Sequence, residues 1–188
     1  MLAWLKRVGL ISAVLFGIVF AVGLLLPTEF TVERTTQINA TPETIHHYVG
    51  DLARWSVWSP WQAEDPSIET ELGDRTSGLG AHQSWTSESG DGEITFTKVD
   101  EQTGIEYDLV FKEGDARLVN LGYIRYRPKG DSTEVIWGMK GDLEEGPLGL
   151  SGYFAVTMDP MLGGMFERGL AKLKQATESP HTGNQGTP

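Results

Sequence analysis

Residues that could carry out acid–base or metal chemistry are few in this sequence and lie far apart. His46 and His47 are adjacent, so their side chains would point about 100° apart on a helix, and His82 and His181 lie far from them along the chain. The absence of cysteine excludes thiolate metal ligands, disulfides and a cysteine nucleophile. We therefore expect no metal site and no cofactor, and the pattern predicts no catalytic residue.

Two further signatures of catalysis are also missing. A nucleophile elbow of the form Gly-x-Ser-x-Gly does not occur, although composition alone leaves a Ser-His-acid triad open. The stretch at 77–80 reads Ser-Gly-Leu-Gly and is followed by a strand-like run rather than a helix, so it does not resemble a phosphate-binding loop. A tight turn into a strand is the better interpretation.

Three tryptophans stand three residues apart in the sequence. We interpret Trp55, Trp58 and Trp61 as core and rim residues that seal one end of a sheet. An alternative is that the exposed members dip into a membrane interface, where tryptophan is enriched.

A methionine stripe occurs near the C-terminus. Met158, Met161 and Met165 are either ordinary core or an adaptable lining for an apolar ligand, because thioethers repack easily. Gly163, Gly164 and Gly169 nearby weaken a helix, which suggests close packing or movement. Our hypothesis is that this helix acts as the lid of a cavity.

Several side chains combine an apolar body with a polar tip. A buried tyrosine hydroxyl or tryptophan N–H needs a hydrogen-bond partner, which is either the backbone or a ligand. The candidates for contact with a ligand are Tyr107, Tyr126, Trp137, His82 and Asn120.

An apolar run near the N-terminus is long enough to cross a membrane. From 8 to 26, nineteen residues carry no charge and thirteen are Val, Leu, Ile or Phe, and at about 1.5 Å per residue the run spans roughly 28 Å. A cleaved signal peptide is the rival interpretation, with a weak site at 21–23, but three leucines carry the apolar run past that site. We predict a retained transmembrane helix.

The charge distribution bears on topology and on partners. Lys6 and Arg7 lie in the short basic segment 1–7 before the apolar run, whereas Arg34 is the only basic residue soon after it. The positive-inside rule then places the N-terminus in the cytoplasm and the domain outside it, as a single-pass membrane protein. The formal net charge is -11, so nucleic acid is not an expected partner, because its phosphates would be repelled.

The remainder predicts one α+β domain at 28–177. A first strand at 30–38 is followed by a helix with Thr41 as N-cap and Pro42 in its first turn. Six further strand-like runs occur at 68–72, 81–86, 93–100, 105–111, 117–127 and 134–141. A long amphipathic helix covers 154–173, and the polar segment 178–188 is expected to be a disordered tail.

Alternation assigns the faces of most of these strands. One face carries the row Ile105, Tyr107, Leu109 and Phe111, and 134–141 has a matching row that includes Trp137. In 117–127 both parities carry apolar residues, so alternation leaves its inner face open.

Four local motifs follow one another along the domain: Ile38-Asn39-Ala40-Thr41-Pro42-Glu43, Trp55-Ser56-Val57-Trp58-Ser59-Pro60-Trp61, Ser77-Gly78-Leu79-Gly80-Ala81 and 166–174. These motifs and the order of the elements resemble the START and Bet v 1-like superfamily, also described as SRPBCC or polyketide cyclase/dehydrase and lipid transport proteins. The resemblance implies a helix-grip fold, in which a curved seven-stranded antiparallel sheet surrounds a long C-terminal helix. It transfers no catalytic residue.

The resemblance also implies a cavity for an apolar ligand between the sheet and the C-terminal helix. We expect inward-facing residues of the later strands and the methionine stripe to line it. These residues are Tyr107, Leu109, Phe111, Ile124, Tyr126, Trp137, Met139, Met158, Met161 and Met165.

Three functions remain open from the sequence. The favoured one is binding, sensing or transfer of a small hydrophobic, lipid-like ligand at a membrane. One alternative is a polyketide cyclase/dehydrase-type enzyme, and the other is a non-catalytic module that binds a protein through its acidic surface. A filled core without a cavity of roughly 300 Å³ or more would favour the last.

Overall fold

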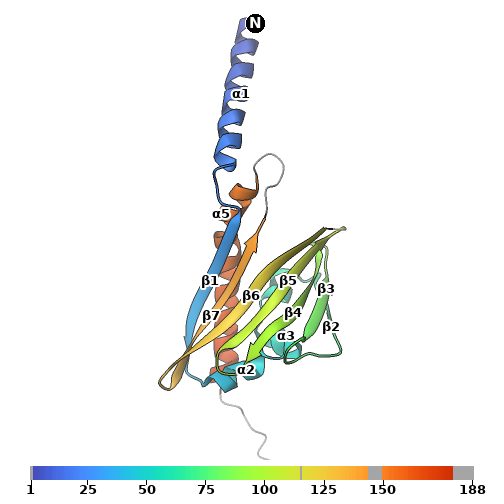
Figure 1. Ribbon diagram of the computed structural model, residues 1–188, viewed down its shortest axis with the longest axis vertical. Coiled ribbons are helices and arrows are strands. Elements are labelled where there is room, and N and C mark those ends of the chain that lie inside the picture. Colours follow the sequence, from blue (N-terminus) through green and yellow to red (C-terminus); the bar gives the residue numbers. More distant parts are fainter. Residues whose placement is uncertain (1, 115, 144–149, 180–188) are drawn as a thin grey trace, which may run out of the picture.

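The computed structural model describes residues 2–114, 116–143 and 150–179. Most of the expected tail lies outside the described residues, and its first position, Glu178, still belongs to a helix. Figure 1 shows the elements, which in chain order are α1 (Leu2–Gly23), β1 (Glu29–Ile38), α2 (Pro42–Val49), the 3-10 helix η1 (Leu52–Arg54), α3 (Trp55–Trp58), α4 (Trp61–Glu64), β2 (Glu69–Leu72), β3 (His82–Thr86), β4 (Asp91–Asp100), β5 (Gly104–Glu113), β6 (Ala116–Lys129), β7 (Ser132–Asp142) and α5 (Ser151–Glu178).

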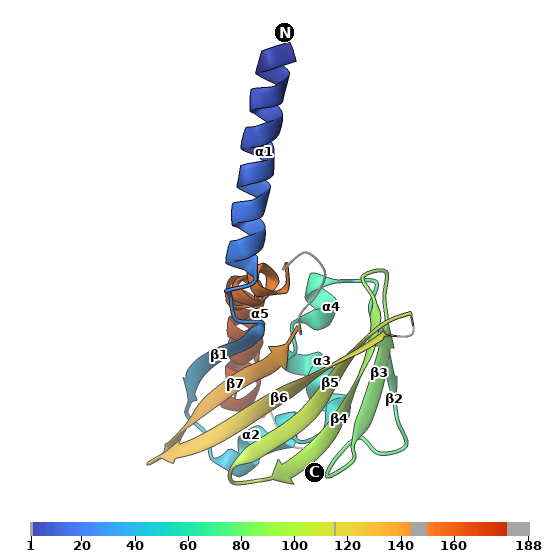
Figure 2. The ribbon, with the colours of Figure 1, turned by 45° about the horizontal axis from the view of Figure 1, so that its top comes forward.

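The strands form one antiparallel sheet. Within the described residues it has seven strands in the order β1-β7-β6-β5-β4-β3-β2. Figure 2 shows α5 against β1 and β7, with α2, α3 and α4 covering the other half of the same face. The predicted α+β helix-grip architecture is confirmed, including every strand-like run that the sequence indicates.

The helix after β1 forms where its capping residues predict. The Thr41 hydroxyl accepts a hydrogen bond from the Thr44 N–H, and Pro42 occupies the first turn, where its missing N–H is not needed. Ile45 and Val49, four residues apart, are both fully buried. This stripe holds α2 against the sheet and directs the chain into η1, α3 and α4.

The sheet buries aromatic residues on both faces. On the inner face Tyr107 and Tyr126 are buried, whereas Phe111 at the end of β5 is 43% exposed. Strand β6 directs Ile124 inward, opposite Trp137 of β7. Its neighbour Tyr123 is also buried, but on the outer face, where its hydroxyl donates to a carboxylate of β1. Apolar residues therefore occur at both odd and even positions of β6, because both faces of the sheet are covered there.

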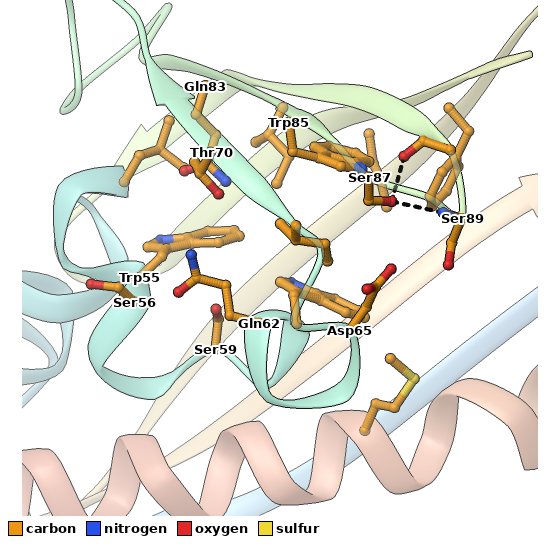
Figure 3. Close-up of a pocket in the computed structure, with 18 of the residues that line it drawn as sticks. Trp55, Ser56, Ser59, Gln62, Asp65, Thr70, Gln83, Trp85, Ser87 and Ser89 are labelled. Carbon is orange, nitrogen blue, oxygen red and sulfur yellow. Dashed lines mark hydrogen bonds between the residues drawn. The ribbon is translucent and has the colours of Figure 1, made fainter.

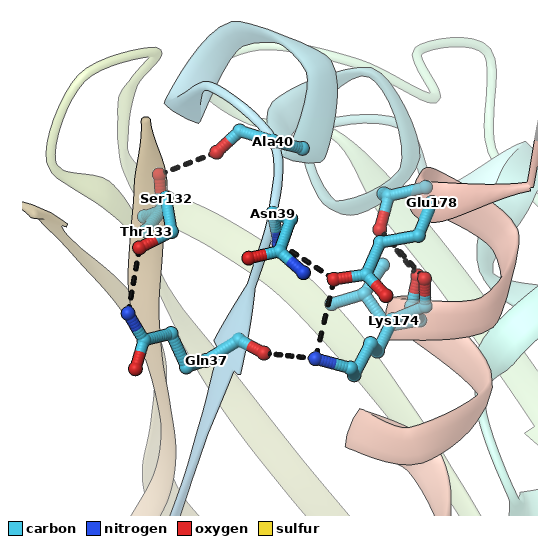
Figure 4. Close-up of polar contacts among 9 residues, drawn as sticks. Gln37, Asn39, Ala40, Ser132, Thr133, Lys174 and Glu178 are labelled. Carbon is cyan, nitrogen blue, oxygen red and sulfur yellow. Dashed lines mark hydrogen bonds and ion pairs between the residues drawn. The ribbon is translucent and has the colours of Figure 1, made fainter. Parts of the chain in front are cut away.

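Helix α5 is fixed to the sheet at its C-terminal end by polar contacts (Figure 4). Lys174 Nζ donates to the Gln37 carbonyl oxygen at 2.5 Å, and Glu178 Oε1 accepts the Asn39 N–H at 2.6 Å. Lys174 and Glu178 also form an ion pair. These contacts join the last turn of α5 to the point where β1 ends.

The other end of α5 meets the N-terminal helix. Helix α1 projects away from the domain, and its C-terminal end lies beside the start of α5 (Figure 1). The Tyr153 hydroxyl donates to the Val19 carbonyl oxygen at 2.8 Å. By length and composition Lys6–Gly23 could cross a membrane, as a retained anchor or as a signal sequence. The helix ends at Gly23 rather than at Leu26, the end of the predicted span.

Candidate ligand-binding site

The strongest candidate site is a largely apolar pocket of about 420 Å³. Helices α3 and α4 form one wall, and strands β2, β3, β4 and β5 form the other (Figure 3). Its volume lies within the range of about 300–1,000 Å³ that is typical of small-molecule sites. The apolar residues of the wall are Leu52, Ala53, Trp55, Trp61, Ile68, Leu72, Trp85, Gly90, Ile94, Leu109, Phe111, Met139, Leu162 and Met165.

The space directly between α5 and β7 is filled rather than open. Trp137 stacks on Phe166 with ring centroids 4.4 Å apart, and Gly169 lies so close to Trp137 that an added Cβ would overlap its ring. The expected cavity is therefore displaced toward β2 and β3, and α5 contributes only Leu162 and Met165 to the pocket.

The residues expected to line the cavity divide into three groups. Four of them are on the pocket wall, namely Leu109, Phe111, Met139 and Met165. Four others are buried in the core away from the pocket, namely Tyr107, Ile124, Tyr126 and Trp137. Met158 packs against the core, and Met161 is 60% exposed.

The three tryptophans before β2 have separate roles. Trp58 is fully buried, and its indole N–H donates to the Tyr48 carbonyl oxygen. Trp55 is also buried, with its N–H donating to the Val49 carbonyl oxygen, and one side of it lines the pocket. The membrane-interface alternative is wrong for both, because neither ring reaches the surface. Trp61 is half-buried and lines the pocket.

Gln83 and Asp65 are two of the polar residues of the wall that were not anticipated from the sequence. Gln83 of β3 is 8% exposed, and its side chain has no hydrogen-bond partner among the described residues. Its amide points into the pocket beside Trp55 (Figure 3). A signal existed, because Ala81, Gln83 and Trp85 share one parity and Ala81 is an obvious inward residue.

Asp65, which follows α4, is another unanticipated polar residue. Its Oδ1 accepts hydrogen bonds from the Ser67 hydroxyl and the Ser67 N–H, at 2.6 and 2.9 Å. These bonds lower the pKa of Asp65 below its ordinary value, so the carboxyl group is ionised at neutral pH. Its Oδ2 is buried without a hydrogen-bond partner. No sequence pattern marks Asp65, because its role depends on where α4 ends.

Tyr107 and Trp137 are joined by a hydrogen bond in the core. The Trp137 N–H donates to the Tyr107 hydroxyl oxygen at 3.0 Å, and burial raises the pKa of Tyr107 to about 12. Both polar tips are thus used inside the protein, rather than by a ligand.

A second, polar hollow of about 480 Å³ lies around α2 and the turn from β4 to β5. His46 is half-buried there, with Nδ1 3.4 Å from the Tyr126 hydroxyl, and burial lowers the pKa of His46. Arg54 hydrogen-bonds His47 and pairs with Asp51. Among the described residues no group of three or more potential ligands is placed to hold a metal ion.

The fold has many structural relatives. CV1439 from Chromobacterium violaceum is 12% identical, with a TM-score of 0.54 over 79% of this chain and 96% of that chain. The Aha1 dimer from Colwellia psychrerythraea is 13% identical, with a TM-score of 0.56 over 79% and 96%. DynU16, from the dynemicin biosynthetic locus, is 11% identical, with a TM-score of 0.53 over 79% of this chain and 47% of that chain. At such identities the likeness shows the fold alone.

Sequence comparison gives the family. No curated protein matches the sequence. The family model described as polyketide cyclase/dehydrase and lipid transport matches residues 29–178, from the start of β1 to the end of α5. That match spans the whole domain, including both walls of the pocket. The chain therefore belongs to the polyketide cyclase/dehydrase and lipid transport family.

Proposed function

We propose that this protein binds a small, largely apolar molecule and senses it or hands it over at a membrane. The observation that carries the proposal is the pocket of about 420 Å³, whose wall includes Trp55, Trp61, Trp85 and Phe111. Aromatic side chains offer a large apolar area at low conformational cost, which suits a lipid-like ligand. A volume above roughly 300 Å³ also argues against the non-catalytic interaction module.

The cyclase/dehydrase alternative has one specific point in its favour. Asp65 is the only ionisable residue on the described pocket wall, so it is the one available general base. The hydrogen bonds from Ser67 lower its pKa, however, and a weakly basic carboxylate is poorly suited to abstracting a proton. Binding without turnover is therefore the better account.

A membrane location is part of the proposal. Helix α1 has the length and composition of a membrane span, and its end packs against α5, next to the domain. If Lys6 and Arg7 remain in the cytoplasm, the domain lies outside it. Labelling an engineered Thr28→Cys in intact cells with a membrane-impermeant thiol reagent tests this topology, since the chain has no other cysteine. Labelling only after lysis would reverse the assignment.

The binding function is tested with a pair of methionines on α5. Met165 lines the pocket, whereas Met161, one turn earlier, is exposed. Met165→Trp should fill the pocket, and Met161→Trp should leave it open. Native mass spectrometry of the full chain from lipid nanodiscs should detect a bound apolar molecule in the wild type and in Met161→Trp, but not in Met165→Trp. If all three proteins are empty even after incubation with a lipid panel, the proposal fails.

A further inference from the structure

The first turn of α5 lies against the part of the chain that has the composition of a membrane span. The Tyr153 hydroxyl donates to the carbonyl oxygen of Val19, which lies inside the candidate span Lys6–Gly23. A Cβ added to Gly152 would lie 3.0 Å from the Gly23 carbonyl oxygen. Both ribbon views show α1 leaving the domain beside the start of α5 (Figures 1 and 2). If α1 crosses a membrane, the start of α5 therefore lies at the surface of that membrane.

One face of α5 is apolar from its first turn to the pocket. Its residues recur every three or four positions, which places them on one side of the helix. They are Leu150, Phe154, Met158, Met161 and Met165. Leu150 is the N-cap, with helical backbone angles, and its carbonyl oxygen accepts the Phe154 N–H. At the other end of the row, Met165 is on the pocket wall.

Most of this row is exposed between the pocket and α1. Leu150, Phe154 and Met161 are 42%, 57% and 60% exposed. Single exposed apolar side chains are common on soluble proteins, but a row on one helix face marks a surface that meets another apolar partner. The face that lines the pocket is thus continued toward α1 by apolar side chains in contact with solvent.

The start of α5 carries no free charge. The segment 150–158 contains no ionisable acid or base apart from Tyr153. The next residue, Asp159, is paired with Arg34, whose Nη1 and Nη2 donate to its two carboxylate oxygens at 2.7 and 3.1 Å. An apolar surface that includes a tyrosine is typical of protein segments at the level of lipid head groups.

Two observations favour lipid over a protein partner on this surface. The same turn of α5 already contacts the candidate span through Tyr153, so a protein seated on Phe154 would compete with the bilayer for the same space. The formal net charge of -11 would repel anionic head groups, so contact with the bilayer depends on apolar side chains.

We propose that the exposed start of α5, with Leu150 and Phe154, rests in the interfacial layer of the bilayer that α1 crosses. This inference rests on the membrane location proposed above, and it names the surface that holds the pocket beside the lipid. An apolar ligand then passes along one helix face, by way of Met161, to Met165 on the pocket wall, rather than through water.

The test measures the surroundings of single nitroxide labels on the full-length chain in nanodiscs, since the chain has no native cysteine. Phe154→Cys and Leu150→Cys report on the start of α5, and Ser12→Cys in α1 supplies the lipid reference. Val57→Cys is the matched control, because Val57 is 56% exposed on α3, which lies away from α1 (Figure 1). Oxygen concentrates in lipid, whereas a nickel chelate stays in water, so the ratio of their collision rates identifies the phase around each label.

We expect this ratio to be several-fold higher at residues 150 and 154 than at residue 57, and to persist at high salt, because salt screens charges and not apolar contacts. Equal ratios at residues 154 and 57, or a ratio at residue 154 that falls at high salt, would overturn the inference. Low collision rates with both reagents at residue 154 would also overturn it, because they would show burial against protein, such as a second copy of the chain.

The reference label and ligand binding separate this inference from the proposed function. A label at residue 12 that is accessible to the nickel chelate would remove the membrane location, and this inference with it. If residue 12 is in lipid and native mass spectrometry detects a bound apolar molecule, but residues 150 and 154 are in water, only the docking of α5 is overturned. Leu150→Cys keeps the test decisive even if Phe154→Cys does not fold.

Discussion

Phe166 of α5 stacks face to face on Trp137 of β7, with ring centroids 4.4 Å apart and ring planes inclined by 11°. Trp58 and Trp61 pack edge-on against the same indole, at centroid distances of 5.2 and 5.9 Å. This aromatic cluster joins α5, α3 and α4 to β7, the strand next to the β1 edge of the sheet. It closes the space under α5 and leaves the pocket open only toward β2 and β3.

The fit of α5 against Trp137 depends on Gly169. A Cβ at this position would overlap the Trp137 ring and would lie 3.1 Å from Pro60 Cδ. Gly169→Ala should therefore destabilise the domain by about 1–3 kcal/mol, because neither the ring nor the proline can move freely. Chemical denaturation measures this. Gly164→Ala is the matched control on the same helix, where the added Cβ meets only the flexible end of Arg168, at 3.3 Å.

In that control, the helix propensity of alanine should dominate, with a gain of up to about 1 kcal/mol. If Gly169→Ala were as stable as Gly164→Ala, the close approach of α5 to Trp137 would be contradicted.

The hydrogen bond between Tyr107 and Trp137 should matter more than a surface hydrogen bond. Tyr107→Phe leaves the fully buried Trp137 N–H without its acceptor at 3.0 Å, which should destabilise the domain by about 1–3 kcal/mol. Tyr48→Phe is the control, because the Tyr48 hydroxyl has no hydrogen-bond partner among the described residues. Thermal unfolding of the two variants should differ clearly; equal Tm values would show that another acceptor replaces the phenol.

Much of the fold was predictable because local signals agreed with the packing. Thr41 and Pro42 mark the start of α2, and alternation in β5 places Tyr107 and Leu109 on the buried face. Alternation could not decide β6, because Tyr123 is apolar in type yet lies on the outer face, where Arg125 covers its ring at 4.1 Å. A strand with both faces covered loses the period-two signal.

The pocket was predictable only in part. Strand alternation predicts that Leu109 and Met139 face inward. Whether an inward-facing residue lines an open pocket or packs against another side chain depends on the distance between α3–α4 and the sheet, which the sequence does not show. The three-residue spacing did not distinguish Trp55 from Trp58. Both are buried, but only Trp55 lines the pocket. The position of Asp65 on the pocket wall depends on where α4, a helix of four residues, ends, and sequence patterns do not determine that point.

Acid should destabilise the domain through His46. Burial lowers the pKa of His46 in the folded state, although Glu101 and Asp100 partly oppose this. The unfolded state therefore binds the extra proton more readily, and stability should fall as the pH drops below the ordinary histidine value of about 6.5. Above that pH the ring is neutral in both states and contributes no pH dependence.

His46→Gln should flatten this part of the stability profile between about pH 7.5 and pH 5. His47→Gln, at the adjacent exposed position, should retain the slope. Tm measurements across this range make the comparison. An identical slope in His46→Gln and the wild type would mean that protonation of this ring is not linked to folding.

The contact between α1 and α5 should restrict the orientation of the domain relative to its N-terminal helix. Gly152 lies against the segment that follows α1, and an added Cβ would come within 2.5 Å of Leu26 Cβ. Gly152→Ala should therefore broaden the distance distribution between spin labels at Ser12→Cys and Ala171→Cys, which attach uniquely because the chain has no cysteine. Gly17→Ala is the control, since a Cβ there has no heavy atom within 4 Å. A narrow distribution in both variants would show that the helix orientation does not depend on this contact, and a broad one already in the wild type would show that the domain is freely tethered.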